Sequence, residues 1–339
     1  MSRPLFKIRE HGKFGFIDAS GEVVIEPQYV AVEDFYNGFA RVQLNDRLVH
    51  LDHLGRPLLR HTFNYVGLFE EHLARARVVR MWGYIDQRGR LAIPVQFYDA
   101  GDFSEGVAAV NFDGLYGYID QWGNEVIEPN FDWAGEFSEG LAPVRIREQE
   151  GYINRNGDMV ILPRFDSAQP FQGNVAVVVQ NGKWGLIDKE GKVLIKPQFD
   201  MIEGYTNGEF FDGMAVASID GKYGFINNEG EIVVPPTYDF AGDFGEGLAL
   251  VEKDGLFGYV DKSGKLAIPP RFEDAGVFSG ELAQVQKNGL WGFMDKDGRV
   301  VIAPRFEEVM PFRNGLAWCV EDDKWEYIDQ WGDVVWREE

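Results

Sequence analysis

The sequence predicts an all-β protein made of ten tandem repeats of about 34 residues. A glycine that follows an aromatic residue recurs every 34 residues, with one longer step of 39 between Gly185 and Gly224. Every copy also carries a turn signal and a β-branched run at fixed distances from that glycine. Similarity at a fixed period is the signature of repeat architectures. This marker glycine is found at Gly15, Gly83, Gly117, Gly151, Gly185, Gly224, Gly258 and Gly292, while Val49 and Glu326 replace it in two copies.

The first two elements of each copy are predicted to form a β-hairpin. Residues 290–306 read LWGFMDKDGRVVIAPRF, with Asp295 after the first strand and Gly298 three places later. The aspartate accepts backbone hydrogen bonds, and glycine supplies the positive φ that closes the turn. Lys296, inside this turn, is expected to be a replaceable surface residue, whereas Gly292 is expected to admit a close neighbour. All ten copies keep the pair, with Asp18, Asp52, Asp86, Asp120, Asn154, Asp188, Asn227, Asp261, Asp295 and Asp329 each followed three places on by glycine.

The returning strand and the connection after it complete each copy. A proline is expected to end the returning strand, since proline has no ladder donor. A third strand, such as 141–144 or 282–285, then leads back through a short turn. Each copy is therefore a three-strand meander with a connection of about 12 residues. Two aromatic sets recur in it: Tyr29, Phe63, Phe97, Phe131, Phe165, Phe199, Tyr238, Phe272 and Phe306, then Phe35, Phe69, Phe103, Phe137, Phe171, Phe210, Phe244, Phe278 and Phe312.

The consensus of the copies resembles a known repeat. The string W-G-Y-I-D-x-x-G-x-x-V-I-x-P-x-F, followed by F-S-E-G-L-A-x-V, is similar to the WG (KWG) repeat family of bacterial β-strand repeats. Residues 81–97, 183–199 and 290–306 carry it most clearly, and the resemblance extends over essentially the whole chain. The departures are 49–50, 149–151, where no aromatic residue precedes the glycine, and 325–326. The resemblance implies a bacterial β-array and brings no catalytic residues with it.

The strand order at the two ends favours an open superhelical array over residues 1–339. The chain begins with a strand of the third type and ends after a returning strand, so all ten units are whole. A closed propeller usually completes one blade from both ends and has four-stranded blades. An open array needs capped ends, and the polar departures of the last copy, about 313–339, are expected to form one cap. A closed, propeller-like ring is the alternative.

Charge narrows the possible partners. The net charge is −22, and residues 1–100 are nearly neutral while the remainder carries the acid. Nucleic acids and anionic membranes are bound through Lys and Arg, so neither is an expected partner. The acidic turns and FSEG-type connections are interpreted as a solvated surface. No apolar run reaches the length of a membrane span and the N-terminus lacks an apolar leader, which favours the cytoplasm.

No catalytic or cofactor motif is present, so neither an enzyme nor a cofactor is predicted. A metal site at His50, His53, His61 and His72 is a weaker alternative to histidines in a drifted second copy. The single cysteine, Cys319, is expected to be a buried small hydrophobe.

Functional residues are sought where the repeat is broken. Exposed Trp and Arg are enriched in binding hot spots. The drifted second copy and its approach to the third hold a basic patch, an insertion lies within 201–212, and two turn tips carry tryptophan. Arg75 and Arg77 should share one face of a strand, which Arg80 joins only if that strand ends or bulges near 78–79. The predicted partner-binding residues are Arg56, Arg60, Arg75, Arg77, Arg80, Trp122, Trp331, Tyr205, Phe210 and Phe211.

The function predicted from these features is non-catalytic protein binding or scaffolding. The alternative is a carbohydrate or cell-wall binding module, in which aromatic residues spaced by one repeat would stack on sugar rings.

Overall fold

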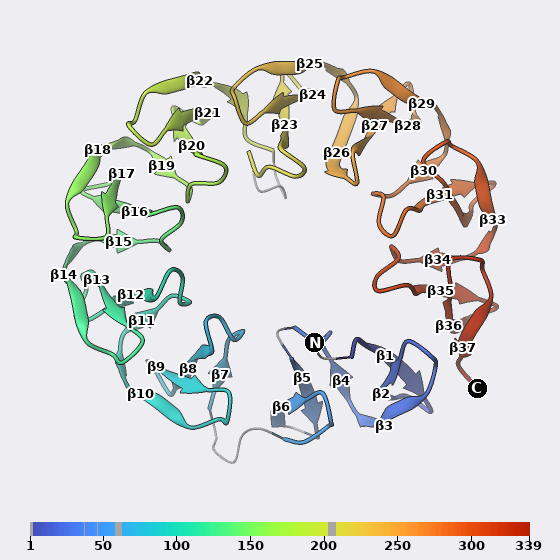
Figure 1. The fold of residues 1–339 in the computed structure, drawn as a ribbon, viewed down its shortest axis with the longest axis horizontal. Coiled ribbons are helices and arrows are strands. Elements are labelled where there is room, and N and C mark those ends of the chain that lie inside the picture. The colour runs from blue at the N-terminus through green and yellow to red at the C-terminus, as the bar shows by residue number, and fades with distance from the viewer. Residues whose placement is uncertain (1–2, 37, 46, 58–62, 203–207) are drawn as a thin grey trace. The chain divides into compact units, whose positions relative to one another are not determined.

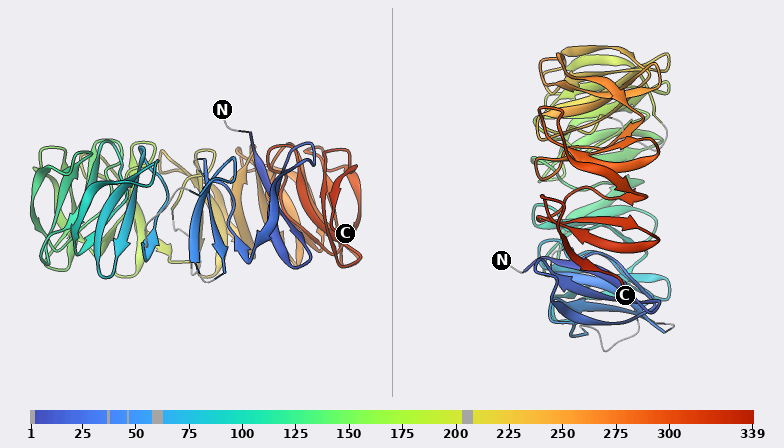
Figure 2. Two further views of the ribbon diagram at one scale, coloured as in Figure 1. Left: turned by 90° about the horizontal axis from the view of Figure 1, so that it is seen from below. Right: turned by 90° about the vertical axis from the view of Figure 1, so that its right-hand side faces the viewer.

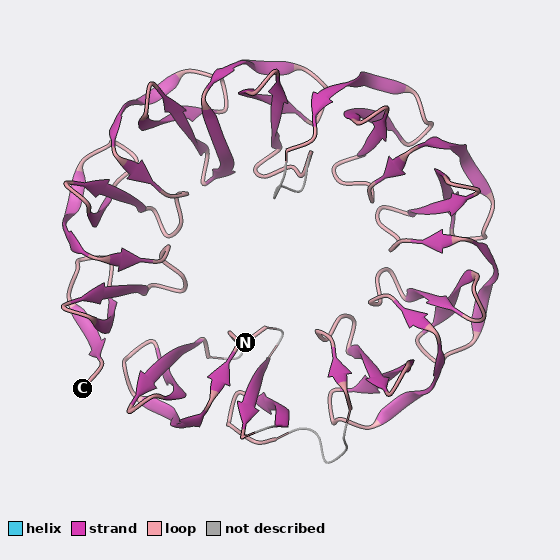
Figure 3. Ribbon diagram, turned by 180° about the vertical axis from the view of Figure 1, so that it is seen from behind, coloured by secondary structure: helices cyan, strands magenta, loops and turns pink. Residues whose placement is uncertain are grey.

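The computed structural model describes residues 3–36, 38–45, 47–57, 63–202 and 208–339, and over these residues the chain forms strands and no helix (Figures 1 and 3). The strands make ten small antiparallel sheets in the described parts of the chain. They belong to two compact units: unit 1 contains Met1–Arg56 and Ile202–Glu339, and unit 2 contains Pro57–Met201. The all-β prediction is confirmed.

Unit 2 consists of four sheets, each of four strands in chain order. The sheets are β7 (Tyr65–Val66), β8 (Leu73–Val78), β9 (Met81–Asp86) and β10 (Leu91–Phe97); β11 (Asp99–Ala100), β12 (Val107–Asn111), β13 (Tyr116–Asp120) and β14 (Glu125–Phe131); β15 (Trp133–Ala134), β16 (Leu141–Ile146), β17 (Gln149–Asn154) and β18 (Met159–Phe165); and β19 (Ser167–Ala168), β20 (Val175–Gln180), β21 (Lys183–Asp188) and β22 (Val193–Asp200).

Unit 1 consists of six sheets, two from the start of the chain and four from its end. The first two are β1 (Leu5–Glu10), β2 (Lys13–Asp18) and β3 (Val23–Tyr29), then β4 (Ala31–Val32), β5 (Phe39–Leu44) and β6 (Arg47–Asp52). The others are β23 (Met214–Ile219), β24 (Lys222–Asn227) and β25 (Ile232–Tyr238); β26 (Phe240–Gly245), β27 (Leu248–Lys253), β28 (Leu256–Asp261) and β29 (Leu266–Phe272); β30 (Asp274–Ala275), β31 (Ala283–Lys287), β32 (Leu290–Met294) and β33 (Val300–Phe306); and β34 (Glu308–Val309), β35 (Ala317–Glu321), β36 (Lys324–Ile328) and β37 (Val334–Arg337).

Most copies have four strands, so the prediction of a three-strand meander is wrong for them. The missing strand lies in the connection, where a short segment pairs with the third-type strand. In β11, Asp99 pairs with Asn111 and Ala100 with Val110. Such a strand is two residues long in six of the seven described sheets of four strands, which is too short to leave an alternating pattern in the sequence.

The hairpin turns form as predicted. Asp120 accepts backbone hydrogen bonds from Trp122 and Asn124 at 2.9 and 2.8 Å, and Gly123 has a φ of 86°.

The proline of the returning strand lies inside that strand rather than at its end. In β33, Pro304 is followed by Phe306, which pairs with Trp291 of β32. The register shifts beside Trp291, so the two strands bulge around Gly292. A Cβ at Gly292 would lie 2.4 Å from the carbonyl oxygen of Ile302. The expectation that proline stops the strand is wrong, because a bulge in an edge strand tolerates the missing donor.

The last copy shows why a side chain can replace this glycine. Its returning strand β37 contains no proline, and Glu326 pairs directly with Arg337 without a shift at that point. The Glu326 carboxylate lies 3.0 Å from Nε of Arg337. The glycine is therefore required by the bulge.

Neighbouring copies of each unit pack through a repeated aromatic contact. The ring of Tyr118 meets Phe137 of the next sheet edge-on, with centroids 4.9 Å apart, and its hydroxyl donates to the Gly135 carbonyl at 2.7 Å. Both aromatic sets predicted from the repeat line these cores; Phe35, Phe63 and Tyr238 are half-buried. The same contact joins Tyr84 to Phe103, Tyr152 to Phe171 and Tyr259 to Phe278.

The first and last sheets contact each other inside unit 1, as the right-hand view of Figure 2 shows. Phe6 and Ile8 of β1 share a buried cluster with Tyr327 and Trp336 of the last sheet. The Tyr327 hydroxyl donates to the carbonyl of Lys7 at 2.8 Å. Tyr327 thus contacts a ring and a carbonyl of the neighbouring sheet, as Tyr118 does, but both belong to strand β1 rather than to a connection.

An ion pair adds to this end-to-end contact. Nε and Nη2 of Arg9 donate to the two carboxylate oxygens of Glu338 at 2.9 and 3.0 Å. The prediction of an open array is therefore wrong at the chain ends, and residues 313–339 do not stand as a free cap. Contact between the two ends is what a closed arrangement requires. It needs no shared sheet, since packing and ion pairing join two complete ones.

Candidate functional site

Arg75 and Arg77 share one face of β8, as their alternation predicts. Both guanidinium groups lie over the Trp82 ring, at 5.7 and 5.3 Å from its centroid. Nε of Arg75 also lies 3.1 Å from the Asp102 carboxylate, and Nη1 donates to the Ala100 carbonyl at 3.1 Å. Arg75 is thus a half-buried joint between two sheets rather than a free cation on a basic patch.

Acidic groups surround this joint. Burial raises the pKa of Asp102, which Arg75 lowers in part and Glu70 raises further. Burial also raises the pKa of Glu136, with Asp102 adding to the effect. The charge near Arg75 is therefore balanced or acidic.

The other predicted arginines lie apart from this joint. Strand β8 ends at Val78, and Arg80 is exposed in the following turn. Arg56 belongs to unit 1, where its Nε lies 2.7 Å from the Asp52 carboxylate. Arg60 lies outside the described residues.

The insertion contributes one core residue. Phe210 is buried and therefore belongs to the packing, while Phe211 is 36% exposed. Tyr205 lies outside the described residues. The role of Phe211 as a contact residue stays a prediction.

The two turn-tip tryptophans are the most exposed large apolar residues that the structure describes. Trp122, in unit 2, is 80% exposed, and Trp331, in unit 1, is 81% exposed. Their indoles contribute little to the core, so both remain candidate contact residues.

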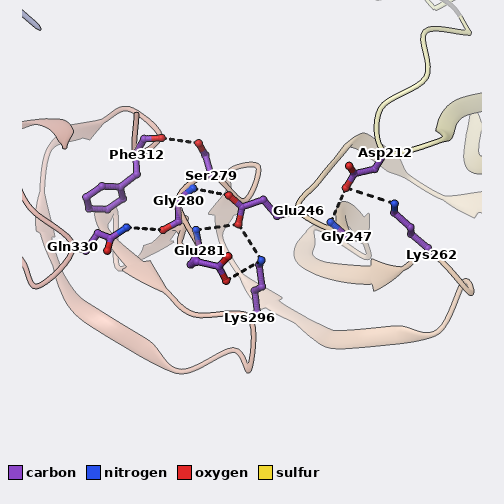
Figure 4. A network of polar contacts seen from close by, with 10 residues as sticks. All are labelled: Asp212, Glu246, Gly247, Lys262, Ser279, Gly280, Glu281, Lys296, Phe312 and Gln330. Carbon is purple, nitrogen blue, oxygen red and sulfur yellow. Dashed lines mark hydrogen bonds and ion pairs between the residues drawn. The ribbon is translucent and has the colours of Figure 1, made fainter. Parts of the chain in front are cut away.

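The acidic residue of the FSEG-type connection links neighbouring copies, a role that the sequence interpretation missed. Glu246 accepts hydrogen bonds from the backbone N–H groups of Gly280 and Glu281, at 2.7 and 3.0 Å (Figure 4). Its carboxylate also lies 3.0 Å from Nζ of Lys296. Lys296 is therefore part of an inter-copy contact, and the expectation of a replaceable turn residue does not describe its surroundings.

This carboxylate contact recurs. Glu139 accepts from the backbone of Gly173 and Asn174 and lies 3.0 Å from Nζ of Lys189. Burial alone would raise the pKa of Glu139. The hydrogen bonds from Lys189 and from these backbone groups outweigh burial and hold that pKa below its ordinary value. In other copies the carboxylate accepts a hydrogen bond from a glycine N–H: Glu71 from Gly106, Glu105 from Gly140 and Asp212 from Gly247. These acids form a structural joint as well as a solvated surface.

A cavity of about 1070 Å³ lies beside the end-to-end contact of unit 1, and we call it the junction cavity. Its described lining comes from the start of β1, the β4–β5 loop, the β34–β35 loop, and strands β35 and β36. Aromatic and apolar side chains form much of the wall. They are Pro4, Leu5, Phe6, Phe35, Met310, Pro311, Phe312, Leu316, Trp318, Trp325 and Tyr327.

The charged residues of the described lining are mainly cationic. Arg3, Lys7 and Arg313 face a single carboxylate, Asp34. Asp34 lies 3.6 Å from Nζ of Lys7 and 3.5 Å from Nη1 of Arg313, and all three side chains are exposed. Arg3 instead pairs with Asp18 at 2.7 Å.

Sequence reasoning missed this cavity because it forms between the two ends of the chain. A partial signal was available. In the L-A-x-V strand the third position is small or aliphatic in copies four to eight, but is Lys7 in the first copy and Trp318 in the last. Arg41, Arg75 and Gln284 depart at the same position, so it does not single out the two ends.

The histidines do not form the alternative metal site within the described residues. His50 is buried, and burial together with Arg41 lowers its pKa to about 4. His53 is exposed at the junction cavity, and His72 belongs to unit 2. His61 lies outside the described residues, and within them no three His, Cys, Asp or Glu groups could hold a metal ion. Cys319 is buried, as predicted.

Comparison with solved structures shows a shared fold. "Crystal structure of the eukaryotic initiation factor" matches 100% of this chain and 96% of that one, with a TM-score of 0.57 at 12% identity. Looser matches include PorZ of Porphyromonas gingivalis, at 12% identity and a TM-score of 0.31 over 97% of this chain and 50% of that one. Hsv2p of Kluyveromyces lactis is 10% identical, with a TM-score of 0.33 over 57% of this chain and 71% of that one.

No curated protein matches the sequence. Among the described residues there is no helix with the length and apolar character of a membrane span. The family described as "WG containing repeat" matches residues 14–47, 82–116, 116–148, 151–184, 184–223, 223–257, 257–291 and 291–325. These matches cover most of the chain, which therefore belongs to the WG repeat family.

Proposed function

We propose that this chain is a non-catalytic binding protein and that its partner is another protein, held at the junction cavity. The cavity itself is the observation that carries the proposal. Consecutive copies bury their aromatic rings against each other, whereas beside the end-to-end contact Trp318 and Trp325 line open space. An apolar concavity with a few charged groups is the common form of a binding site.

The carbohydrate alternative loses its main support. It needs aromatic rings that recur on the surface, but the two repeated aromatic sets are largely buried. Trp122 and Trp331, at turn tips outside these sets, are the most exposed aromatic residues described, and they belong to different units. They favour a secondary contact, with either a protein or a sugar.

Affinity capture from a native lysate, with and without a blocked cavity, tests the proposal. Met310→Trp adds bulk at a lining position that is 57% exposed. The matched control is Leu162→Trp, at a position 71% exposed on β18 in unit 2. We expect a partner, identified by mass spectrometry, to be retained by the control and lost with Met310→Trp. Equal capture by both variants would overturn the proposal.

Three further experiments test the turn-tip tryptophans, the carbohydrate alternative and the predicted location. Trp331→Ser in the same capture measures the secondary contact, and a polysaccharide pulldown with Trp122→Ser measures the sugar alternative. Cell fractionation tests the predicted cytoplasmic location.

A further inference from the structure

We propose that the junction cavity binds an acidic linear segment of the partner protein, one with a carboxylate beside a large apolar side chain. This inference rests on the proposed function and adds the chemistry of the ligand to it.

The apolar half of the site consists of aromatic walls. The indoles of Trp318 and Trp325 meet edge-on, at 90° and 5.3 Å between ring centroids. Met310, whose backbone N–H donates to the Trp318 carbonyl at 2.8 Å, adds an exposed, adaptable thioether beside strand β35. The volume, about 1070 Å³, lies just above the roughly 300–1,000 Å³ of small-ligand pockets. A short extended segment fits such a space, whereas a folded surface does not enter it.

The charged half of the site selects an anion. In the described lining two cations, Lys7 and Arg313, share one carboxylate, Asp34, while Arg3 is paired with Asp18. The Lys7 and Arg313 pairs with Asp34 are long, at 3.6 and 3.5 Å, and solvent reaches all three groups. Exposed pairs of this kind contribute little stability, so both cations can turn to a ligand carboxylate at small cost.

The acidic surface around these cations makes the cavity more selective for an acidic segment. The whole chain carries a net charge of −22, so most of its surface repels an acidic segment. A cationic cavity on an acidic body restricts such a ligand to one place and disfavours other contacts.

The indole N–H of Trp318 also favours a ligand that carries a hydrogen-bond acceptor. Its Nε1–H is enclosed and has no acceptor in the structure. A buried indole N–H usually finds a partner. A small turn of the ring on binding would let a ligand carbonyl or carboxylate satisfy this donor.

Binding of two matched peptides to the full chain tests the ligand chemistry. The probes are fluorescent peptides of sequence Gly-Phe-Asp-Leu-Glu-Phe-Gly and Gly-Phe-Asn-Leu-Gln-Phe-Gly, followed by fluorescence anisotropy. We expect the acidic peptide to bind at least tenfold tighter than its amide counterpart, and its affinity to fall as salt rises. Equal affinities, or no binding of the acidic peptide, would overturn the inference.

Charge variants of the cavity give opposite signs. Arg313→Glu should weaken the acidic peptide about tenfold or more, since it replaces attraction with repulsion. Asp34→Asn should strengthen it severalfold, because it removes the competing carboxylate and releases both cations. A merely structural role for this cluster would lower affinity in both variants. The matched control is Arg299→Glu, which changes an exposed, ion-paired arginine in the β32–β33 turn and should leave affinity unchanged.

The two levels of the proposal fail separately. If Met310→Trp abolishes partner capture but the two peptides bind equally, the ligand chemistry is wrong and the cavity remains the binding site. If Met310→Trp leaves partner capture intact, the proposed function fails whatever the peptides do.

Discussion

At the residue scale, the marker glycine of the repeat is explained by the backbone opposite it. A Cβ at Gly15, Gly151 or Gly258 would lie 2.3–2.5 Å from a carbonyl oxygen of the returning strand. Sequence alternation predicted a close approach at Gly292, and this is confirmed. The approaching group, the bulged edge strand of the same sheet, was not predicted, because proline was interpreted as the end of that strand.

Gly292→Val should destabilise the chain by about 2 kcal/mol or more, because the new side chain forces the bulge in β33 apart. The control is Val300→Ile at an exposed position of the same strand, for which we expect a change within about 0.5 kcal/mol. Urea denaturation measures both. Similar midpoints for the two variants would contradict the steric role of the glycine.

His50 should make stability depend on pH in the weakly acidic range. Its pKa in the folded chain is about 4, below the ordinary 6.5, because of burial and the nearby Arg41. Between these two values the unfolded chain binds a proton that the folded chain does not. Stability therefore falls as pH drops below 6.5, by roughly 1 kcal/mol per pH unit.

Replacing this histidine isolates its contribution. His50→Leu should flatten the pH dependence of the unfolding free energy between pH 6.5 and 4, whereas His53→Gln, at an exposed position, should leave it unchanged. An unaltered slope in His50→Leu would show that other groups cause the dependence.

At the scale of elements, the inter-copy carboxylate explains why the FSEG acid recurs. The sequence showed where these acids occur but not what they contact, since their partners are backbone N–H groups about 35 residues away. Backbone donors carry no sequence signal. The short strands in the connections escaped prediction for a related reason, because two residues are too few to display alternation.

Glu246→Gln should lower stability at pH 7 by about 1 kcal/mol, since it removes the ion pair with Lys296 and weakens two charge-assisted hydrogen bonds. Burial alone would raise the pKa of Glu246, but Lys296 and the backbone donors hold it below its ordinary 4.5. The stabilisation is thus present above pH 4.5 and lost as pH falls through the folded pKa. The matched control is Asp297→Asn, at an exposed carboxylate. An equal loss of stability in Asp297→Asn would show that the contacts of Glu246 between copies add nothing specific.

Arg75 gives a prediction for β8. The sequence predicted Arg75 to belong to a basic patch for partner binding, but Arg75 contacts Asp102 across two sheets and lies near further acids. Arg75→Glu should therefore destabilise the chain by about 2 kcal/mol or more, as a half-buried carboxylate beside like charges. Arg80→Glu, in the exposed turn, should be nearly neutral. Equal melting temperatures would restore the view of a free basic patch.

At the scale of the whole molecule, the repeat period predicted ten sheets and their all-β class but not how the chain ends meet. Three strands per copy and whole terminal units favoured an open array. Whole terminal units are consistent with the structure, yet they do not exclude contact, because Phe6, Tyr327 and Trp336 join two complete sheets through side chains, without a shared strand ladder. Such packing is set by side chains about 320 residues apart, which periodicity does not relate.

The ion pair between Arg9 and Glu338 gives the test at this scale. Its two parallel hydrogen bonds join the first strand to the residue after the last one. Arg9→Glu and Glu338→Arg should each lower stability by about 1 kcal/mol, since each leaves like charges together. The double variant restores opposite charges and should recover most of the loss.

The interaction energy from this double-mutant cycle shows whether Arg9 and Glu338 are in contact. Residues in contact show an interaction energy of about 0.5 kcal/mol or more, whereas distant residues add. An open array would keep the two chain ends far apart, so its cycle would be additive at every salt concentration. End-to-end contact predicts a coupling that shrinks as salt is raised, because part of each side chain is exposed to solvent. Thermal unfolding of the four proteins at low and high salt distinguishes the two.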